Sequence, residues 1–89
     1  MLFALTCIDK PGALQIRLDN RPAHLEFLNT SGKVLFAGPF IEADKPVGSL
    51  VVIEMADRAA AEAFAAADPY ARAGLFDSVT IREWRKVIG

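Results

Sequence analysis

Few residues of this chain have side chains that could do chemistry, and they fall in two short stretches. The stretch "RPAHLEFL" carries His24, the only histidine among 89 residues. The stretch "AAADPYARAGLF" places Asp68 where a run of alanines stops, with Tyr70 just behind it. A histidine can take or give a proton near neutral pH, and a carboxylate can orient its ring. We therefore ask whether the two stretches build one acid–base site.

A stripe of basic side chains accompanies the histidine. Arg17, Arg21 and His24 are spaced i, i+4 and i+7, which places them on one side of a helix. Either arginine could hold a carboxylate or phenolate of a ligand, with Tyr70 as a wall or hydroxyl donor. Ser49 completes the candidates for ligand binding. The alternative is that both arginines extend into water and His24 is an ordinary boundary residue.

Asp68 also has two interpretations. Asp-Pro is common turn chemistry, in which the carboxylate bonds local amides. A negative charge is nonetheless unfavourable beside the last carbonyl groups of a helix, by a few tenths of a kcal/mol. A nearby cation would remove this penalty, and His24 could supply it if both helices lie on one face of a sheet.

Composition excludes several classes of protein. The net charge is −1 and the pI is near 5.7, so no broad positive field is available for nucleic acid or an anionic membrane. One cysteine and one histidine do not make a transition-metal centre, and we expect no metal or other cofactor. The apolar run around Cys7 is too short to span a membrane and lacks the features of an export signal. We expect a soluble cytoplasmic protein.

Hydrophobic patterning predicts alternating strands and helices in one domain, residues 1–89. Apolar runs bounded by turn residues indicate strands. An interior proline costs about 3 kcal/mol in a helix, so Pro22 predicts a short first helical piece and a second helix that begins at the proline. Gly32 is a natural helix stop, and Asp57 a natural cap. The predicted strands are 1–8, 33–40, 49–55 and 77–88. Of the predicted helices, the first is short and ends near residue 19, the second spans 22–30, and the third spans 58–67.

The order strand, helix, strand, strand, helix, strand predicts a ferredoxin-like α+β fold. With right-handed crossovers it gives an antiparallel sheet with both helices on one face. The runs "LFALTCI" and "SLVVIEM" are nevertheless apolar on both faces. A second copy of the chain is the simplest cover for the other face, so we expect a homodimer.

Three motifs in order resemble the YciI-like family of small bacterial proteins. They are "RPAHLEFL", then "SGKVLFAGPF", then "ADPYARAGLFDSVTIREWRKV", and the resemblance covers essentially the whole chain. The connection "IEADKPVGSL" is shorter than in many relatives. The resemblance implies a ferredoxin-like fold paired into a dimeric α+β barrel, and an active site at His24 and Asp68. It also favours Arg21, which lies in the motif, over Arg17.

The resemblance leaves the reaction open. Related branches act on hydroxylated or chlorinated aromatic rings, which suggests a small aromatic or anionic metabolite by analogy. His24 would then transfer a proton while Asp68 fixes its tautomer, in an elimination, an isomerisation or a related step. A ligand-binding or regulatory dimer is the main alternative. A purely structural contact between the two helices is the third.

Overall fold

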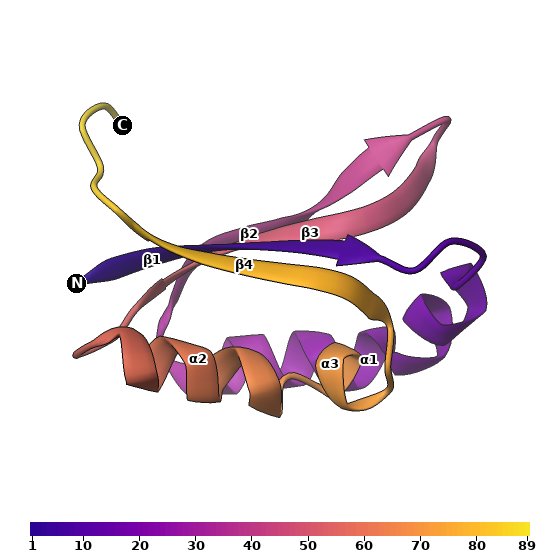
Figure 1. The fold of residues 1–89 in the computed structure, drawn as a ribbon, viewed down its shortest axis with the longest axis horizontal. Helices are drawn as coiled ribbons and strands as arrows, with labels where there is room; N and C mark the ends of the chain where they lie inside the picture. Colours follow the sequence, from indigo (N-terminus) through magenta and orange to yellow (C-terminus); the bar gives the residue numbers. More distant parts are fainter.

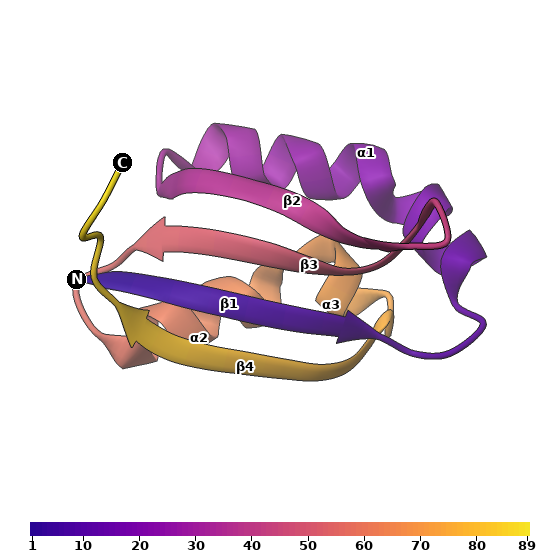
Figure 2. The same ribbon diagram turned by 90° about the horizontal axis from the view of Figure 1, so that it is seen from above.

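A computed structural model describes all 89 residues of the chain. Its strands form one antiparallel sheet in the order β2-β3-β1-β4, and its helices all lie on one face of that sheet (Figures 1 and 2). This is the predicted ferredoxin-like arrangement. The elements are β1 (Leu2–Asp9), α1 (Leu14–Ser31), β2 (Val34–Glu42), β3 (Lys45–Glu54), α2 (Arg58–Ala67), α3 (Pro69–Arg72) and β4 (Phe76–Trp84).

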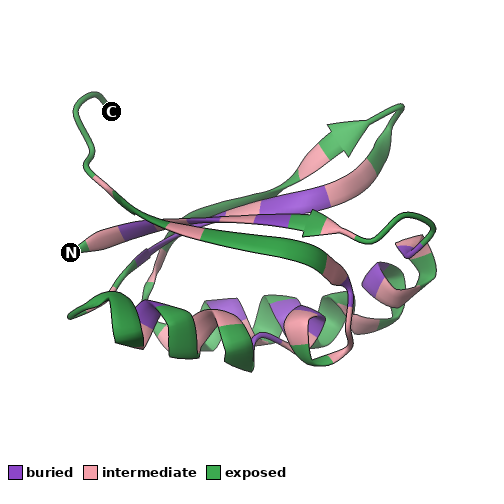
Figure 3. Ribbon diagram, viewed as in Figure 1, coloured by how far each residue is buried: buried purple, intermediate pink, exposed green.

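The two central strands direct alternate side chains toward the helices. Phe3, Leu5 and Cys7 of β1 are buried on this face, and in the register they oppose Ile53, Val51 and Ser49 of β3. Leu28 of α1 and Ala61 of α2 pack on the same cluster, and the small side chain of Ala61 lets α2 approach the sheet closely. Figure 3 shows the buried positions gathered in this layer between sheet and helices. This layer is the hydrophobic core.

Helix α1 is continuous through Pro22, so the predicted break at this residue is wrong. Pro22 is exposed, and its ring therefore meets solvent. The buried face of α1 extends across the proline, from Arg17 on one side to His24 and Leu28 on the other. Keeping all three on the sheet requires one helix axis, and this packing offsets the cost of the interior proline. The helix ends at Gly32, which has the left-handed φ of 69°, as predicted.

Strand β2 also continues further than predicted. It runs through Gly38 and Pro39 to Glu42, whereas the sequence indicated a strand end at these residues. A proline is tolerated here because β2 is an edge strand, one side of which has no partner. A tight hairpin then leads into β3, and its two turn residues, Ala43 and Asp44, have φ values of 50° and 62°. The connection "IEADKPVGSL" between the two strands therefore forms a hairpin.

The second helical region has caps at both of its ends. The predicted cap of α2 is confirmed, because the Asp57 carboxylate accepts the amide of Ala60 at 2.8 Å. The helix ends at Asp68, and the single helical turn α3 begins there. The Asp68 carboxylate accepts the Tyr70 amide at 2.9 Å. Asp68 is therefore also the N-cap of a new turn, so its carboxylate has a hydrogen-bond donor that offsets its unfavourable position at the end of α2.

The opposite face of the sheet has no helix over it (Figure 1). Ile8 and Phe36 on this face are 42% and 48% exposed. Trp84, the last residue of β4, packs edge-to-face against Phe36 of β2, with ring centroids 5.9 Å apart. We call this surface the open face. No helix of the chain is long and apolar enough to cross a membrane.

Candidate active site

The two stretches singled out in the sequence meet between α1 and α3. His24 Nδ1 lies 2.8 Å and 3.0 Å from the two oxygens of Asp68. Both residues are buried, at 6% exposed each. An ionised carboxylate accepts from this nitrogen, so Nδ1 carries a proton, and in the neutral form of the ring Nε2 has the lone pair. Nε2 has no hydrogen bond within the chain, and no buried side-chain nitrogen or oxygen lacks a partner, so Nε2 remains open to solvent.

Tyr70 holds the imidazole ring in place. The rings of His24 and Tyr70 are stacked, with centroids 3.9 Å apart and planes 14° from parallel. The guanidinium carbon of Arg17 also lies 4.7 Å from the centroid of the Tyr70 ring. One aromatic ring, supplied by the short α3 turn, therefore contacts two functional side chains of α1, two helical turns apart.

Arg17 is held by the end of β1 and by β3. Its Nε and Nη2 donate to the two oxygens of Asp9 at 2.7 Å and 2.8 Å. Nη2 also donates to Ser49 Oγ at 3.0 Å. None of these bonds uses Nη1, and they leave the hydroxyl hydrogen of Ser49 free to be donated. The arrangement is bidentate, the strongest geometry for an arginine–carboxylate pair.

These groups line a cavity of about 310 Å³ between α1 and the β2–β3 half of the sheet. Arg17, His24, Ser49 and Tyr70 contribute its buried polar part. Much of the remaining wall is apolar, from Leu18, Leu25, Leu28, Pro39, Ile41 and Val51. A few convergent polar groups in an apolar cleft of this size suit a small planar molecule.

Of the six candidates for the site, the structure brings five directly into this cavity. Asp68 lies behind the histidine and does not line it. Arg21, which the resemblance favoured over Arg17, lies at the exposed rim, where it makes no ion pair. Arg17 is instead the buried arginine, at 4% exposed.

Burial and charge shift two pKa values in the cavity. Burial raises the pKa of the Tyr70 hydroxyl, although the positive charges of Arg17 and Arg21 oppose this rise. The phenol therefore stays protonated at neutral pH. Burial alone lowers the pKa of Arg17, but its hydrogen bond to Asp9 and the charge of Asp9 raise it above the ordinary value. Arg17 is thus a permanent cation.

Asp9 is a functional-site neighbour that the sequence patterns did not reveal. It follows the apolar strand directly and precedes Lys10-Pro11-Gly12, so it looked like turn punctuation. Its side chain is only 7% exposed, and it is paired with a buried cation. An acidic residue between a buried strand and a turn is a candidate partner for a buried arginine, since a buried arginine requires a counter-charge.

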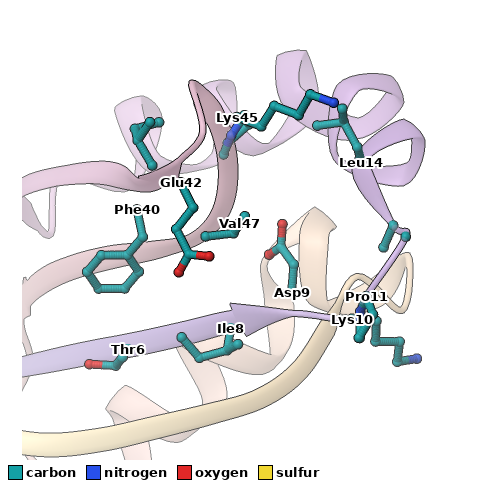
Figure 4. Close-up of a pocket in the computed structure, with 14 residues that line it drawn as sticks. Thr6, Ile8, Asp9, Lys10, Pro11, Leu14, Phe40, Glu42, Lys45 and Val47 are labelled. Atoms are coloured by element: carbon teal, nitrogen blue, oxygen red, sulfur yellow. The ribbon is translucent and has the colours of Figure 1, made fainter.

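A larger hollow of about 770 Å³ lies at the other side of Asp9. Figure 4 shows its walls, with Phe40 and Glu42 directed from the hairpin toward β1 and with Asp9 near Val47. It contains neither His24 nor Asp68. No group of three or more His, Cys, Asp or Glu side chains is placed to hold a metal ion. The cavity beneath α1 is therefore the one that contains the histidine.

The fold is that of a large class of small proteins, the dimeric α+β barrels. An antibiotic biosynthesis monooxygenase has a TM-score of 0.60 to this chain at 21% identity, with 99% of this chain and all of the other covered. At that identity the similarity concerns the fold alone. The class defined by fold and site is thus a ferredoxin-like α+β domain with a buried polar cavity beneath its first helix.

The particular family follows from sequence. Residues 1–85 match the YCII-related domain, and the chain belongs to this family. It is 37% identical to protein YciI of Escherichia coli O6:H1 over 97 aligned positions, which cover 98% of this chain and 99% of the relative. The resemblance stated from the motifs is confirmed.

One solved relative has a known activity. It is 5-chloro-2-hydroxyhydroquinone dehydrochlorinase (TftG) of Burkholderia phenoliruptrix AC1100, in complex with 2,5-dihydroxybenzoquinone. The TM-score is 0.89 at 33% identity, with 96% of this chain and 94% of the other covered.

Proposed function

We propose that this protein is an acid–base enzyme that acts on a small hydroxylated ring. The observation that carries the proposal is the open Nε2 of His24, whose other ring nitrogen is bonded to buried Asp68 at 2.8 Å. Asp68 fixes the tautomer with a basic Nε2 and stabilises the imidazolium that forms when Nε2 takes a proton. This is the arrangement that a general base needs.

The cavity supports a ring as the substrate. Its apolar wall and volume of about 310 Å³ suit a planar molecule, and Arg17 and Ser49 can donate to its oxygen atoms. Tyr70 adds a phenol that stays protonated at neutral pH, since burial raises its pKa. A relative of 33% identity is a dehydrochlorinase solved with a dihydroxybenzoquinone, and this supports the same class of ligand here.

The residues can carry two kinds of step. His24 Nε2 takes the proton of a ring hydroxyl, and the imidazolium returns it to a ring carbon, which gives the keto tautomer. If that carbon bears a leaving group, a second hydroxyl can lose its proton to His24. Its O–H electron pair then forms a C=O π bond, the adjacent ring C=C pair shifts to the carbon that bears the leaving group, and that group departs with its bonding pair. The first step alone is an isomerisation, and both together are an elimination.

Turnover of 5-chloro-2-hydroxyhydroquinone tests the proposal. We expect chloride release and a quinone absorbance band from the purified protein. His24→Gln should lower kcat by at least about 100-fold, because a general base contributes 10²–10⁴-fold. Glu26→Gln, an exposed substitution on the same helix, is the matched control and should leave kcat unchanged.

Two results would count against an enzyme. Equal rates for His24→Gln and the wild type would exclude the histidine as the base. Tight binding of 2,5-dihydroxybenzoquinone with no turnover of any hydroxylated ring would favour the ligand-binding or regulatory role.

We also propose that the protein is a homodimer in which two open faces meet. Ile8 and Phe36 are large apolar side chains left 42% and 48% exposed there, and no helix of the chain covers them. Sedimentation equilibrium at micromolar concentration should give twice the chain mass of 9.6 kDa. Phe36→Asp should shift the protein to the monomer, and a wild-type monomer would refute the arrangement.

A further inference from the structure

Asp9 is a buried carboxylate that takes no part in the proton transfer proposed above. It contacts neither His24 nor the open part of the cavity, and both of its oxygens are bonded to Arg17. The two side chains are 7% and 5% exposed, so solvent screens their mutual attraction weakly. The charge of Asp9 must therefore affect any ligand that approaches Arg17.

A ligand in the cavity meets Arg17 as part of a neutral pair. Opposite charges held at 2.7 Å form a dipole, and the field of a dipole falls with distance faster than that of a single charge. The N–H groups of Nη1 lie outside the bonds to Asp9 and Ser49 and can still donate. The cavity thus offers hydrogen-bond donors from Arg17 with less positive charge than an unpaired arginine would present.

The remaining buried charge near the cavity is negative. Asp68 lies behind His24, and with the imidazole neutral nothing buried balances this carboxylate. Arg21 is an unpaired cation whose charge reaches Tyr70, but it is exposed at the rim, where water and salt weaken its field. A ring carboxylate therefore gains less from Arg17 here than it would gain from an unpaired arginine. An uncharged ring that loses its proton only to His24 is favoured, because the new phenolate then faces an imidazolium.

We propose that Asp9 is a specificity-determining residue, which neutralises Arg17 and thereby makes the cavity select uncharged hydroxylated rings over ring carboxylates. The proposal rests on the proposed function, in that it takes a hydroxylated ring as the ligand of this cavity. It adds the charge of the preferred substrate and a residue that sets it.

Two ligands of nearly equal shape test the selection. 2,5-Dihydroxybenzamide is uncharged, and 2,5-dihydroxybenzoate carries one negative charge at neutral pH. Titration calorimetry gives the Kd of each for the wild type and for Asp9→Asn. The wild type should bind the benzamide more tightly. Asp9→Asn exposes the ligand to the charge of Arg17, and we expect the ratio of the two Kd values to shift toward the benzoate by about tenfold.

A matched control and a second variant keep the test sound. Asp19→Asn removes the same charge from an exposed position of α1 and should leave the ratio unchanged. Asp9→Asn leaves a buried guanidinium unpaired and could prevent folding. The double variant Asp9→Asn/Arg17→Gln removes both charges and avoids this problem. It should weaken both ligands while keeping their ratio within about threefold of the wild type.

The outcomes separate this inference from the proposed function. If both ligands bind the wild type and Asp9→Asn leaves their ratio unchanged, Asp9 does not set the selection and the acid–base site stands. A selective loss of benzoate binding in the double variant would likewise show that Arg17 acts on ligands with its full charge. If the wild type binds neither ligand, the hydroxylated-ring substrate is wrong, and the role of Asp9 falls with it.

Discussion

The layer between helices and sheet has an apolar end and a polar end, and the two are buried to a similar degree. Phe3, Leu5, Val51 and Ile53 fill the apolar end and are at most 2% exposed. The polar end contains Arg17, His24, Ser49 and Asp68, which are 3–6% exposed, and Asp9, whose side chain is 7% exposed. Burying the first set stabilises the fold by about 25 cal/mol per Å² of apolar area. Burying the second costs desolvation that ion pairing often only offsets.

The difference indicates what each end is for. A chain of 89 residues buries a modest share of its surface, and a polar end in so small a core costs stability that apolar residues would have supplied. The polar end also borders the cavity with the open histidine nitrogen. We therefore expect substitutions at the apolar end to change the free energy of unfolding, and substitutions at the polar end to change binding and turnover.

Ile53→Ala should have the largest effect on stability. Ile53 is fully buried at the centre of the apolar end, and removing a buried isoleucine side chain to alanine costs about 3 kcal/mol. Urea unfolding should show this loss, and the Tm should fall by more than about 10 °C. The Kd for 2,5-dihydroxybenzoquinone should not change at a temperature where the variant is folded.

Val79→Ala is the control, since Val79 points to the same face from β4 but is 38% exposed. It should cost less than about 1 kcal/mol. A loss as small as this for Ile53→Ala would show that the apolar end does not carry the stability of the fold.

Asp68→Asn should have the largest effect on activity. Asparagine can still accept the Tyr70 amide and cap α3, but its amide group can turn to donate to His24 Nδ1. Nε2 would then carry the proton and could not act as a base. We expect kcat to fall by at least about 100-fold, or about 2.7 kcal/mol in activation free energy, with little change in Tm.

Nitrogen NMR of the single histidine provides an independent check. The wild type should show the form protonated at Nδ1, and Asp68→Asn the form protonated at Nε2. The same form in both proteins would contradict the orienting role of Asp68.

Cys7 lies where the two ends meet, opposite Ser49 in the sheet, and predicts a fall of stability at high pH. Burial, with a further contribution from the charge of Asp68, raises the pKa of the Cys7 thiol to about 12. In the unfolded chain a thiol ionises near pH 8.5, so the unfolded state loses its proton first. Stability therefore falls as pH rises from about 8.5 toward 12.

Between pH 8 and pH 9.5 this loss should amount to about 1 kcal/mol in urea unfolding. Cys7→Ala removes the titrating group, so its unfolding free energy should decline less over the same interval. Parallel curves for the two proteins would show that the thiol ionises as readily in the fold as outside it.

The smallest expected change is a gain of stability at the hairpin beside the polar end. Asp44 has a φ of 62°, a conformation that glycine adopts without strain. Asp44→Gly should therefore stabilise the protein by about 0.5 kcal/mol in urea unfolding. Gly32→Ala, at a φ of 69°, is the reverse control and should cost about 1 kcal/mol. A loss with Asp44→Gly would mean that the aspartate itself supports the turn.

The fold was largely predictable because its signals are local. Apolar runs separated by turn residues indicate the four strands, and the order of elements then leaves few topologies. Pro22 and the Gly38-Pro39 pair gave wrong boundaries. Such residues usually end a helix or a strand, but here tertiary packing overrides this local preference. The buried face of α1 crosses the proline, and the edge position of β2 needs no amide from Pro39.

The site was predictable in part. His24 and Asp68 were expected to meet across two helices on one face, and they do so at 2.8 Å. The preference for Arg21 over Arg17 as the residue near the chemistry could not be checked by spacing, because both lie on one stripe. What separates them is Asp9, which holds only Arg17. That contact joins α1 to the last residue of β1, and the hydrophobic periodicity of the sequence does not reveal it.

Trp84 has a consequence for how the protein can be observed. It is the only tryptophan of the chain, and it packs on Phe36 at the open face, away from the cavity beneath α1. Its emission wavelength therefore depends on whether water reaches that face. If two open faces meet as proposed, dilution of the native protein should shift the emission to the red at the concentration where the two chains separate. The intrinsic fluorescence of Trp84 can therefore report association of the chains without an added dye or label.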